Sequence, residues 1–194
     1  LMLFSDIIGL QETKQQLIEM VAQNRLIHAL LFLGKEGNGA LPLALAFAQY
    51  ISLLPVQSSL QTRAASMFDE PAAKPSLPHT LSHAESFIQN QPGYVKASQL
   101  IHPDIHFSYP VFTRKSGEKP IATHFLKEWR EFIKLVPYGN AYDWLQFINA
   151  ENKQGNINKD ECQNIIRKLS LKTFEAPVKT LILWLPEYLG NEGN

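Results

Sequence analysis

The chain has a single cysteine, Cys162, among its 194 residues. One thiol can neither close a disulfide within the chain nor supply a zinc site built from several cysteines, and this usage suits a reducing compartment. Nothing near Cys162 in the sequence would activate a nucleophile. We therefore interpret it as an incidental or buried thiol.

The sequence also lacks an excess of charge of either sign and lacks long hydrophobic runs. Lys and Arg number 18, as do Asp and Glu, so no overall basic field attracts nucleic acid, and any contact with DNA has to be local or shared with partners. No apolar run reaches membrane-spanning length and no signal peptide is recognisable, so we expect a cytoplasmic protein that does not enter a membrane. With 45% hydrophobic and 10% aromatic residues, the chain can bury a full core.

Several segments show the periodicity of buried helices or strands. Apolar spacing predicts helices within residues 3–24, 41–51, 122–135, 143–148 and 160–169, and strands at 28–33, 104–107 and 178–185. Strands that alternate with helices predict an α/β fold with a mainly parallel sheet. Residues 52–98 contain scattered prolines and only weak periodicity, so we expect an irregular insertion there.

Residues 34–41, GKEGNGAL, have the spacing of a phosphate-binding loop, GxxxxGK(S/T), between a predicted strand and a predicted helix. In a working loop the lysine neutralises the terminal phosphates and the Ser or Thr hydroxyl binds magnesium. Ala40 and Leu41 occupy these positions and can do neither. A charge-assisted hydrogen bond contributes about 1.5–3 kcal/mol, so loss of the lysine alone should weaken nucleotide binding by roughly one to two orders of magnitude. A vestigial pocket without catalysis or cofactor is therefore expected at Gly34, Gly37, Gly39, Ala40 and Leu41.

A second part of the ATPase machinery is also missing. In an active P-loop NTPase, a later apolar strand ends in acidic residues that orient magnesium and water. Here Trp184 and Leu185 stand at the strand end, and Glu187 is the nearest carboxylate. Loss at two separate positions favours a non-catalytic protein of this fold. The alternative is an active ATPase in which Lys35 and Glu187 supply the missing groups.

His102, Asp104 and His106 would share one face of a strand and form a possible metal-binding set. However, Pro103 interrupts the strand and only two imidazoles are present. We therefore expect no metal, and a metal-dependent enzyme is the weaker alternative.

Six segments, taken in order, resemble one protein family. They are FSDIIG (4–9), NRLIHALLFLGKEGNG (24–39), LIHPDIHF (100–107), AENKQGNI (150–157), KLSLK (168–172) and VKTLILWLPE (178–187). Together they resemble the delta-prime subunit of the bacterial DNA polymerase III clamp loader, particularly its Bacteroidetes-type sequences. The resemblance implies that residues 1–194 form a three-layer AAA+ (RecA-like) P-loop NTPase domain. It also implies that the chain ends before the family's lid and collar domains.

The resemblance further implies a non-catalytic subunit of the complex that loads the sliding clamp onto primed DNA in replication. Its direct partners would be the delta and gamma or tau subunits, and it would reach the clamp and the primer-template DNA through the assembled complex. The family's arginine finger would lie beyond residue 194. Family members usually carry a four-cysteine zinc module before the HPD segment, but residues 52–98 contain no cysteine. We therefore expect neither zinc nor ATP use.

Overall fold

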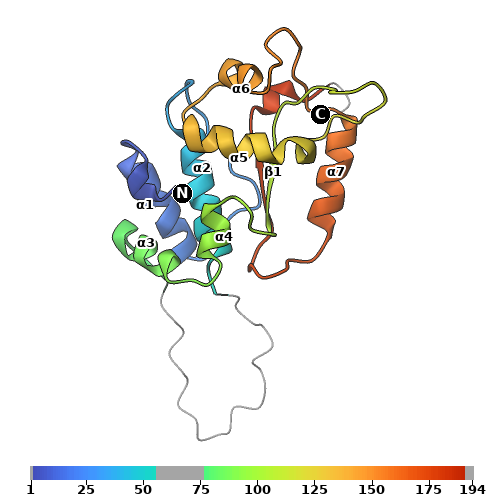
Figure 1. Cartoon of the computed structure of the whole chain (residues 1–194). Coiled ribbons are helices and arrows are strands. Elements are labelled where there is room, and N and C mark those ends of the chain that lie inside the picture. The colour runs from blue at the N-terminus through green and yellow to red at the C-terminus, as the bar shows by residue number, and fades with distance from the viewer. Residues whose placement is uncertain (1, 56–76, 191–194) are drawn as a thin grey trace, which may run out of the picture.

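The computed structural model describes residues 2–55 and 77–190, which form a mixed α/β structure (Figure 1). The described residues hold seven α-helices, a parallel sheet of two strands and three short 3-10 helices. The α-helices are α1 (Gln11–Ala22), α2 (Ala40–Ser52), α3 (Leu81–Gln89), α4 (Tyr94–Ser98), α5 (Leu126–Leu135), α6 (Ala141–Phe147) and α7 (Lys159–Ser170). The strands are β1 (Ile105–Ser108) and β2 (Thr180–Leu183), and the 3-10 helices are η1 (Phe4–Asp6), η2 (Ala122–Phe125) and η3 (Pro186–Tyr188).

The two strands confirm the prediction of parallel pairing. Ile105 lies opposite Thr180 and Ser108 opposite Leu183. The Trp184 N–H extends the ladder by donating to the Ser108 carbonyl at 2.9 Å. Parallel strands need a long crossover, and here the crossover contains α5, α6 and α7. α2 packs against both strands, and α5 crosses β1 in the view of Figure 1.

The strand predicted at residues 28–33 does not form in the described structure. Its side chains do alternate: Leu30 and Phe32 pack against the core, whereas Leu31 and Leu33 are 78% and 85% exposed. Within the described residues, however, no backbone hydrogen bond joins this segment to another. The prediction was wrong because a strand needs a neighbouring strand as well as an apolar sequence, and neither β1 nor β2 pairs with these residues.

The helices predicted from periodicity are confirmed, with ends shifted by a few residues. α6 and α7 each begin after an asparagine that caps the helix: the Asn140 side chain accepts from the Asp143 N–H, and that of Asn158 accepts from the Glu161 N–H. α2 is almost entirely buried, which explains its continuous apolar sequence. The helix predicted at 122–135 differs at its start, because residues 122–125 form the tighter η2.

Part of the segment expected to be irregular is helical. α3 begins after Thr80, whose hydroxyl accepts from the His83 N–H, and it buries Ala84 and Ile88 from one face. α4 follows and buries Ala97. The prediction was wrong for this part because two short helices give too few apolar repeats to be recognised from sequence. The rest of the expected insertion, residues 56–76, lies outside the described residues.

An aromatic cluster forms the part of the core where β1 and β2 end. Trp129 of α5 stacks on Tyr109 with ring centroids 4.2 Å apart and meets Trp144 of α6 edge-on at 5.4 Å. The buried Trp144 indole N–H donates to the Pro110 carbonyl at 2.7 Å. These rings fix α5 and α6 over the strand ends. In the described part of the chain, no helix is long and apolar enough to cross a membrane.

Candidate functional site

The loop of residues 34–39 forms a tight turn that leads directly into α2. Gly37 and Gly39 adopt φ angles of 73° and 91°, a left-handed conformation that is open to glycine at little cost. The Asn38 N–H donates to the Lys35 carbonyl at 3.2 Å, which closes the turn. The glycine spacing noted in the sequence therefore has a conformational reason at both positions.

The exposed Asn38 side chain folds back on its own loop. Its Oδ1 accepts a hydrogen bond from the Ala40 N–H at 3.0 Å, so one free amide of the first helical turn is already used. On the other side the Asn38 amide lies against Gly34, where even a Cβ atom would overlap it. In a nucleotide-binding loop, backbone N–H groups at this place surround phosphate. Here one of these groups is bonded to the protein's own side chain.

Ala40 and Leu41, the two positions where the pattern departs from a working loop, take part in packing. Ala40 is the first residue of α2, and Leu41 is only 7% exposed and belongs to the hydrophobic core. A buried leucine side chain cannot ligate magnesium, which needs oxygen atoms. Lys35, the alternative lysine, is exposed in the turn.

The connection between α5 and α6 covers the loop. The Tyr138 ring lies 3.3 Å from the position that a Cβ on Gly39 would take, and its hydroxyl accepts from the Ile8 N–H at 3.0 Å. The Asn140 amide donates to the Glu36 carboxylate at 3.3 Å. Sequence reasoning missed this covering because Tyr138 and Asn140 lie about one hundred residues away from the loop and carry no motif.

The end of β2 is packed rather than open. Trp184, at the position where an active site would carry an acid, joins the aromatic cluster with ring centroids 5.3 Å from Trp129 and 6.0 Å from Phe132. Leu185 adopts a left-handed φ of 59° and turns the chain into η3. Glu187 is exposed in η3.

Of the three residues His102, Asp104 and His106, Asp104 accepts the most hydrogen bonds. It is 1% exposed, and its two oxygens accept three backbone N–H groups, from Phe174 at 2.7 Å, Glu175 at 2.8 Å and Ala176 at 2.9 Å. Burial alone would raise the pKa of Asp104, but the three backbone donors outweigh it and hold the pKa below its usual value. This carboxylate therefore ties the segment before β2 to the segment before β1.

The two histidines have separate environments. Buried His102 accepts the Asp104 N–H on Nδ1 at 3.2 Å, and its Nε2 lies 3.3 Å from the Glu175 carboxylate. Burial lowers the pKa of His102, although Glu175 and Asp104 oppose the shift. His106 lines a cavity on β1. Within the described residues, no three His, Cys, Asp or Glu side chains are placed to hold a metal ion.

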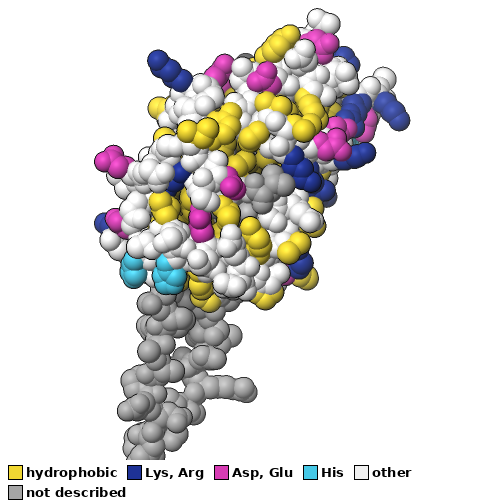
Figure 2. Space-filling view, turned by 60° about the vertical axis from the view of Figure 1, so that its left-hand side comes forward, with side chains coloured by type: hydrophobic (Ala, Val, Ile, Leu, Met, Phe, Trp, Pro, Cys, Tyr) yellow, Lys and Arg dark blue, Asp and Glu magenta, His cyan; other side chains and the backbone are white. Residues whose placement is uncertain are grey.

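Apolar side chains are exposed beside the loop. Ile8 is 81% exposed, and Leu31 and Leu33 precede the first loop glycine. Figure 2, which turns the side of α1 and α3 towards the viewer, shows hydrophobic side chains gathered over part of this face. Large apolar surfaces on soluble proteins commonly mark interaction sites. The surface composed of Ile8, Leu31 and Leu33 is called the loop-side apolar surface below.

Comparison of the chain with models of protein families, with curated proteins and with solved structures found no match.

Proposed function

We propose that this protein is a non-catalytic subunit of a bacterial clamp loader, similar to the delta-prime subunit, whose P-loop serves as a structural element. The observation that carries the proposal is the loop of residues 34–39. The exposed Asn38 side chain accepts the Ala40 N–H, and Ala40 and Leu41 stand at the positions of both nucleotide-binding side chains. A loop in this state offers no lysine for a phosphate and no ligand for magnesium.

The finer fold proposed is an AAA+ P-loop NTPase domain. Three features support it: a glycine loop that leads directly into the buried α2, a parallel pair β1–β2 joined through helices, and the contact of α2 with both strands. The strand that this fold usually places before the loop is not formed by residues 28–33 in the described structure, so the proposal rests on the three features above.

The mechanism proposed is geometric. A ligand shifts a protein between conformations only through different affinities for them, so a subunit that binds no nucleotide keeps one shape while its neighbours respond to ATP. Tyr138 and Asn140 hold the loop from outside, which stiffens this part of the domain. The loop-side apolar surface would bind a delta or gamma/tau subunit. The sliding clamp and the primer-template DNA would be reached through the assembled complex, in the cytoplasm.

Two measurements test this function. In a calorimetric titration with magnesium-ATP, we expect no heat of binding up to about 1 mM, a concentration that detects affinities of about −4 kcal/mol or stronger. In a binding assay with immobilised delta and tau subunits, we expect association that weakens when Leu31 and Leu33 are both replaced by serine. Lys35→Ala is the matched control, because it changes an exposed side chain close to the same surface.

Two outcomes would contradict the proposal. Micromolar binding of magnesium-ATP that Lys35→Ala abolishes would favour an active ATPase. If the wild-type chain associated with no clamp-loader subunit, the assignment to that complex would be wrong. The conclusion that the loop binds no nucleotide would still stand.

A further inference from the structure

A cavity of about 230 Å³ lies between β1, α5 and α7, away from the loop of residues 34–39. The volume far exceeds the 10–15 Å³ or so that one water molecule needs and falls below the range of roughly 300–1,000 Å³ for drug-sized ligands. An occupant would therefore be smaller than a nucleotide. Its walls include the apolar side chains of Leu100, Ile105, Phe107 and Leu126.

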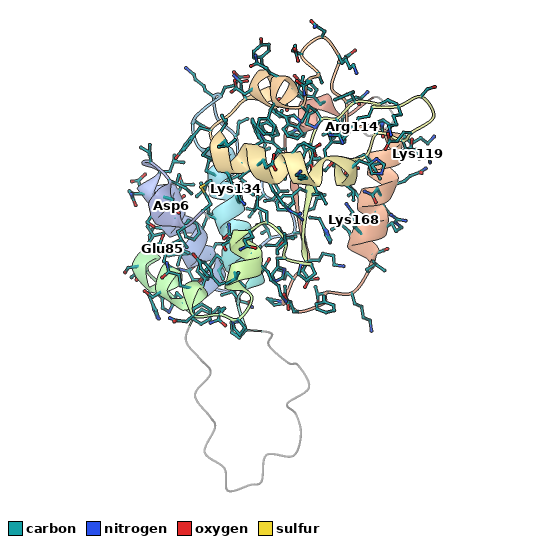
Figure 3. All side chains as sticks on the ribbon, in the orientation of Figure 1. Asp6, Glu85, Arg114, Lys119, Lys134 and Lys168 are labelled. Carbon is teal, nitrogen blue, oxygen red and sulfur yellow. The ribbon has the colours of Figure 1, made fainter. Side chains whose placement is uncertain are left out.

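Two cationic side chains line this cavity. Lys168 reaches from α7 towards β1 (Figure 3), and its Nζ donates to the Thr123 hydroxyl at 2.9 Å. Arg130 comes from α5, and its Nε donates to the Leu100 carbonyl at 3.1 Å. Lysine has three donors and arginine five, so each side chain uses one donor in these bonds and keeps others for a ligand or solvent.

Among the described residues, no acidic side chain lines the cavity. Two acids act on its groups from outside the lining. Burial lowers the pKa of Lys168 and the charge of the buried Glu161 opposes that shift, and the charge of Asp104 opposes the lowering of the His106 pKa. The positive charges of nearby lysines act on His106, which also lines the cavity. Burial lowers the pKa of His106, and the charges of Lys168 and Lys179 lower it further.

His106 lines the cavity, but its Nε2 is buried and has no hydrogen-bond partner among the described residues. A buried polar atom without a partner costs about 1–3 kcal/mol of stability. Because this atom is not accessible from the cavity, a ligand has to be held by Lys168 and Arg130.

We propose that this cavity binds a small organic oxyanion, a carboxylate or a phosphate monoester with a short apolar part. The oxyanion would pair with Lys168 and Arg130, and the apolar part would lie on the walls of the cavity. Such amphiphilic pockets, mostly apolar with a few convergent polar groups, are typical of small-molecule sites. The inference does not depend on the clamp-loader proposal, because the cavity and the glycine loop share no residue.

The test is an NMR titration of the wild-type protein with benzoate and, separately, with inorganic phosphate. We expect the amide signals of residues 105–107, 123 and 168 to shift in a saturable way. Benzoate should bind more tightly than phosphate if the apolar wall contributes. Because this mapping uses the unmodified protein, it does not depend on whether a variant folds.

Variants then identify the charges that act. Lys168→Met and Arg130→Gln should each weaken binding by about tenfold or more, as expected for loss of a charge-assisted hydrogen bond. Arg167→Gln and Lys127→Gln are matched controls, since they remove exposed cations from the same two helices, and they should leave binding within about twofold. The proposal is overturned if no saturable shift occurs up to about 10 mM ligand, or if the control variants weaken binding as much as the cavity variants.

Discussion

Building a nucleotide-binding loop into this protein should succeed better with three substitutions than with two. Ala40→Lys and Leu41→Thr supply the side chains that the loop lacks. They leave Asn38 in place, with its Oδ1 bonded to the Ala40 N–H at 3.0 Å and its amide against Gly34. The Asn38 side chain has to give up this hydrogen bond before the N–H of residue 40 can bind a phosphate. We therefore expect the additional change Asn38→Ala to raise affinity for magnesium-ATP beyond that of the double variant.

The size of this gain follows from the hydrogen bond that Asn38 loses. A neutral hydrogen bond contributes a net 0.5–1.5 kcal/mol or so, and 1.4 kcal/mol corresponds to about tenfold in affinity. The triple variant should therefore bind roughly two- to twelvefold more tightly than the double variant. Asn38 is not among the residues with a positive φ, so alanine fits its backbone conformation. Replacing the buried Leu41 should cost about 2–4 kcal/mol of stability in both variants.

Calorimetric titration with magnesium-ATP measures the comparison, and thermal unfolding without ligand confirms that each variant is folded. Asn38→Ala alone is the control. It should show no heat of binding, because it frees the Ala40 N–H without supplying a lysine or a metal ligand. Equal affinities of the double and triple variants would refute the reasoning, since Asn38 would then be no obstacle. Binding of micromolar ATP by the wild-type protein would contradict the premise that its loop does not bind nucleotide.

Three further predictions concern the groups that position the strands. Asp104→Asn should lower the free energy of unfolding by about 2–4 kcal/mol in urea denaturation, because an amide offers only one acceptor oxygen to three backbone donors; a loss below 0.5 kcal/mol or so would contradict that role. Stability should also decrease in two steps as the pH is lowered, because the folded pKa values of His102 and His106 lie below the usual 6.5, and those of Asp104 and Glu128 lie below the usual 3.8 and 4.5. These groups bind fewer protons when folded, so their stabilising contribution is present above the unfolded pKa; the losses should begin near pH 6.5 for the histidines and between pH 4.5 and 3.8 for the acids, and Asp104→Asn should reduce the second step. Trp184→Asp should lose roughly 1.5–3 kcal/mol of stability, less than for a fully buried ring, and gain no ATPase activity, because the partly buried tryptophan packs on Trp129 and Phe132; Trp184→Phe, which keeps a ring, should retain most of the stability.

The elements that could be predicted from sequence are those whose signal is local. Helix α2 follows from a continuous apolar run after the loop, and α7 from its apolar spacing. The parallel pairing of β1 and β2 follows from two apolar runs separated by helices. In α2 the residues that carry the pattern are also those that the structure buries, whereas in α7 the buried residues are Glu161 and Asn164, and the apolar Ile166 and Leu169 are 69% and 43% exposed.

The parts that could not be predicted depend on contacts between distant residues. Residues 28–33 have the sequence of a strand, but strand formation depends on a partner that no local pattern identifies. The sequence identified His102, Asp104 and His106 only as a possible metal-binding set. Its structural role became visible only with the backbone N–H groups of residues 174–176, about seventy positions further along the chain.

Asn38 shows a different limit of sequence reasoning, because it lies inside the motif itself. The loop pattern leaves this position unspecified, yet asparagine is a residue whose side chain competes for nearby backbone amides. Here it takes the Ala40 N–H at the start of α2. A polar residue at an unspecified position of a glycine loop can therefore compete for the backbone N–H groups that the loop would offer to a ligand.

Leu41 and Trp184 stand where the proposed P-loop fold would carry a hydroxyl and an acid, and both contribute to packing. Leu41 is part of the hydrophobic core, and the partly buried Trp184 extends the aromatic cluster over the strand ends. A hydroxyl or carboxylate at either place would remove apolar contacts, and at Leu41 it would also place a polar group where water is scarce. Loss of a core side chain costs several kcal/mol, and total stability is typically only about 5–15 kcal/mol. Under the proposed function, introducing polar residues at both positions would therefore consume a large part of the stability, which disfavours a change to nucleotide chemistry.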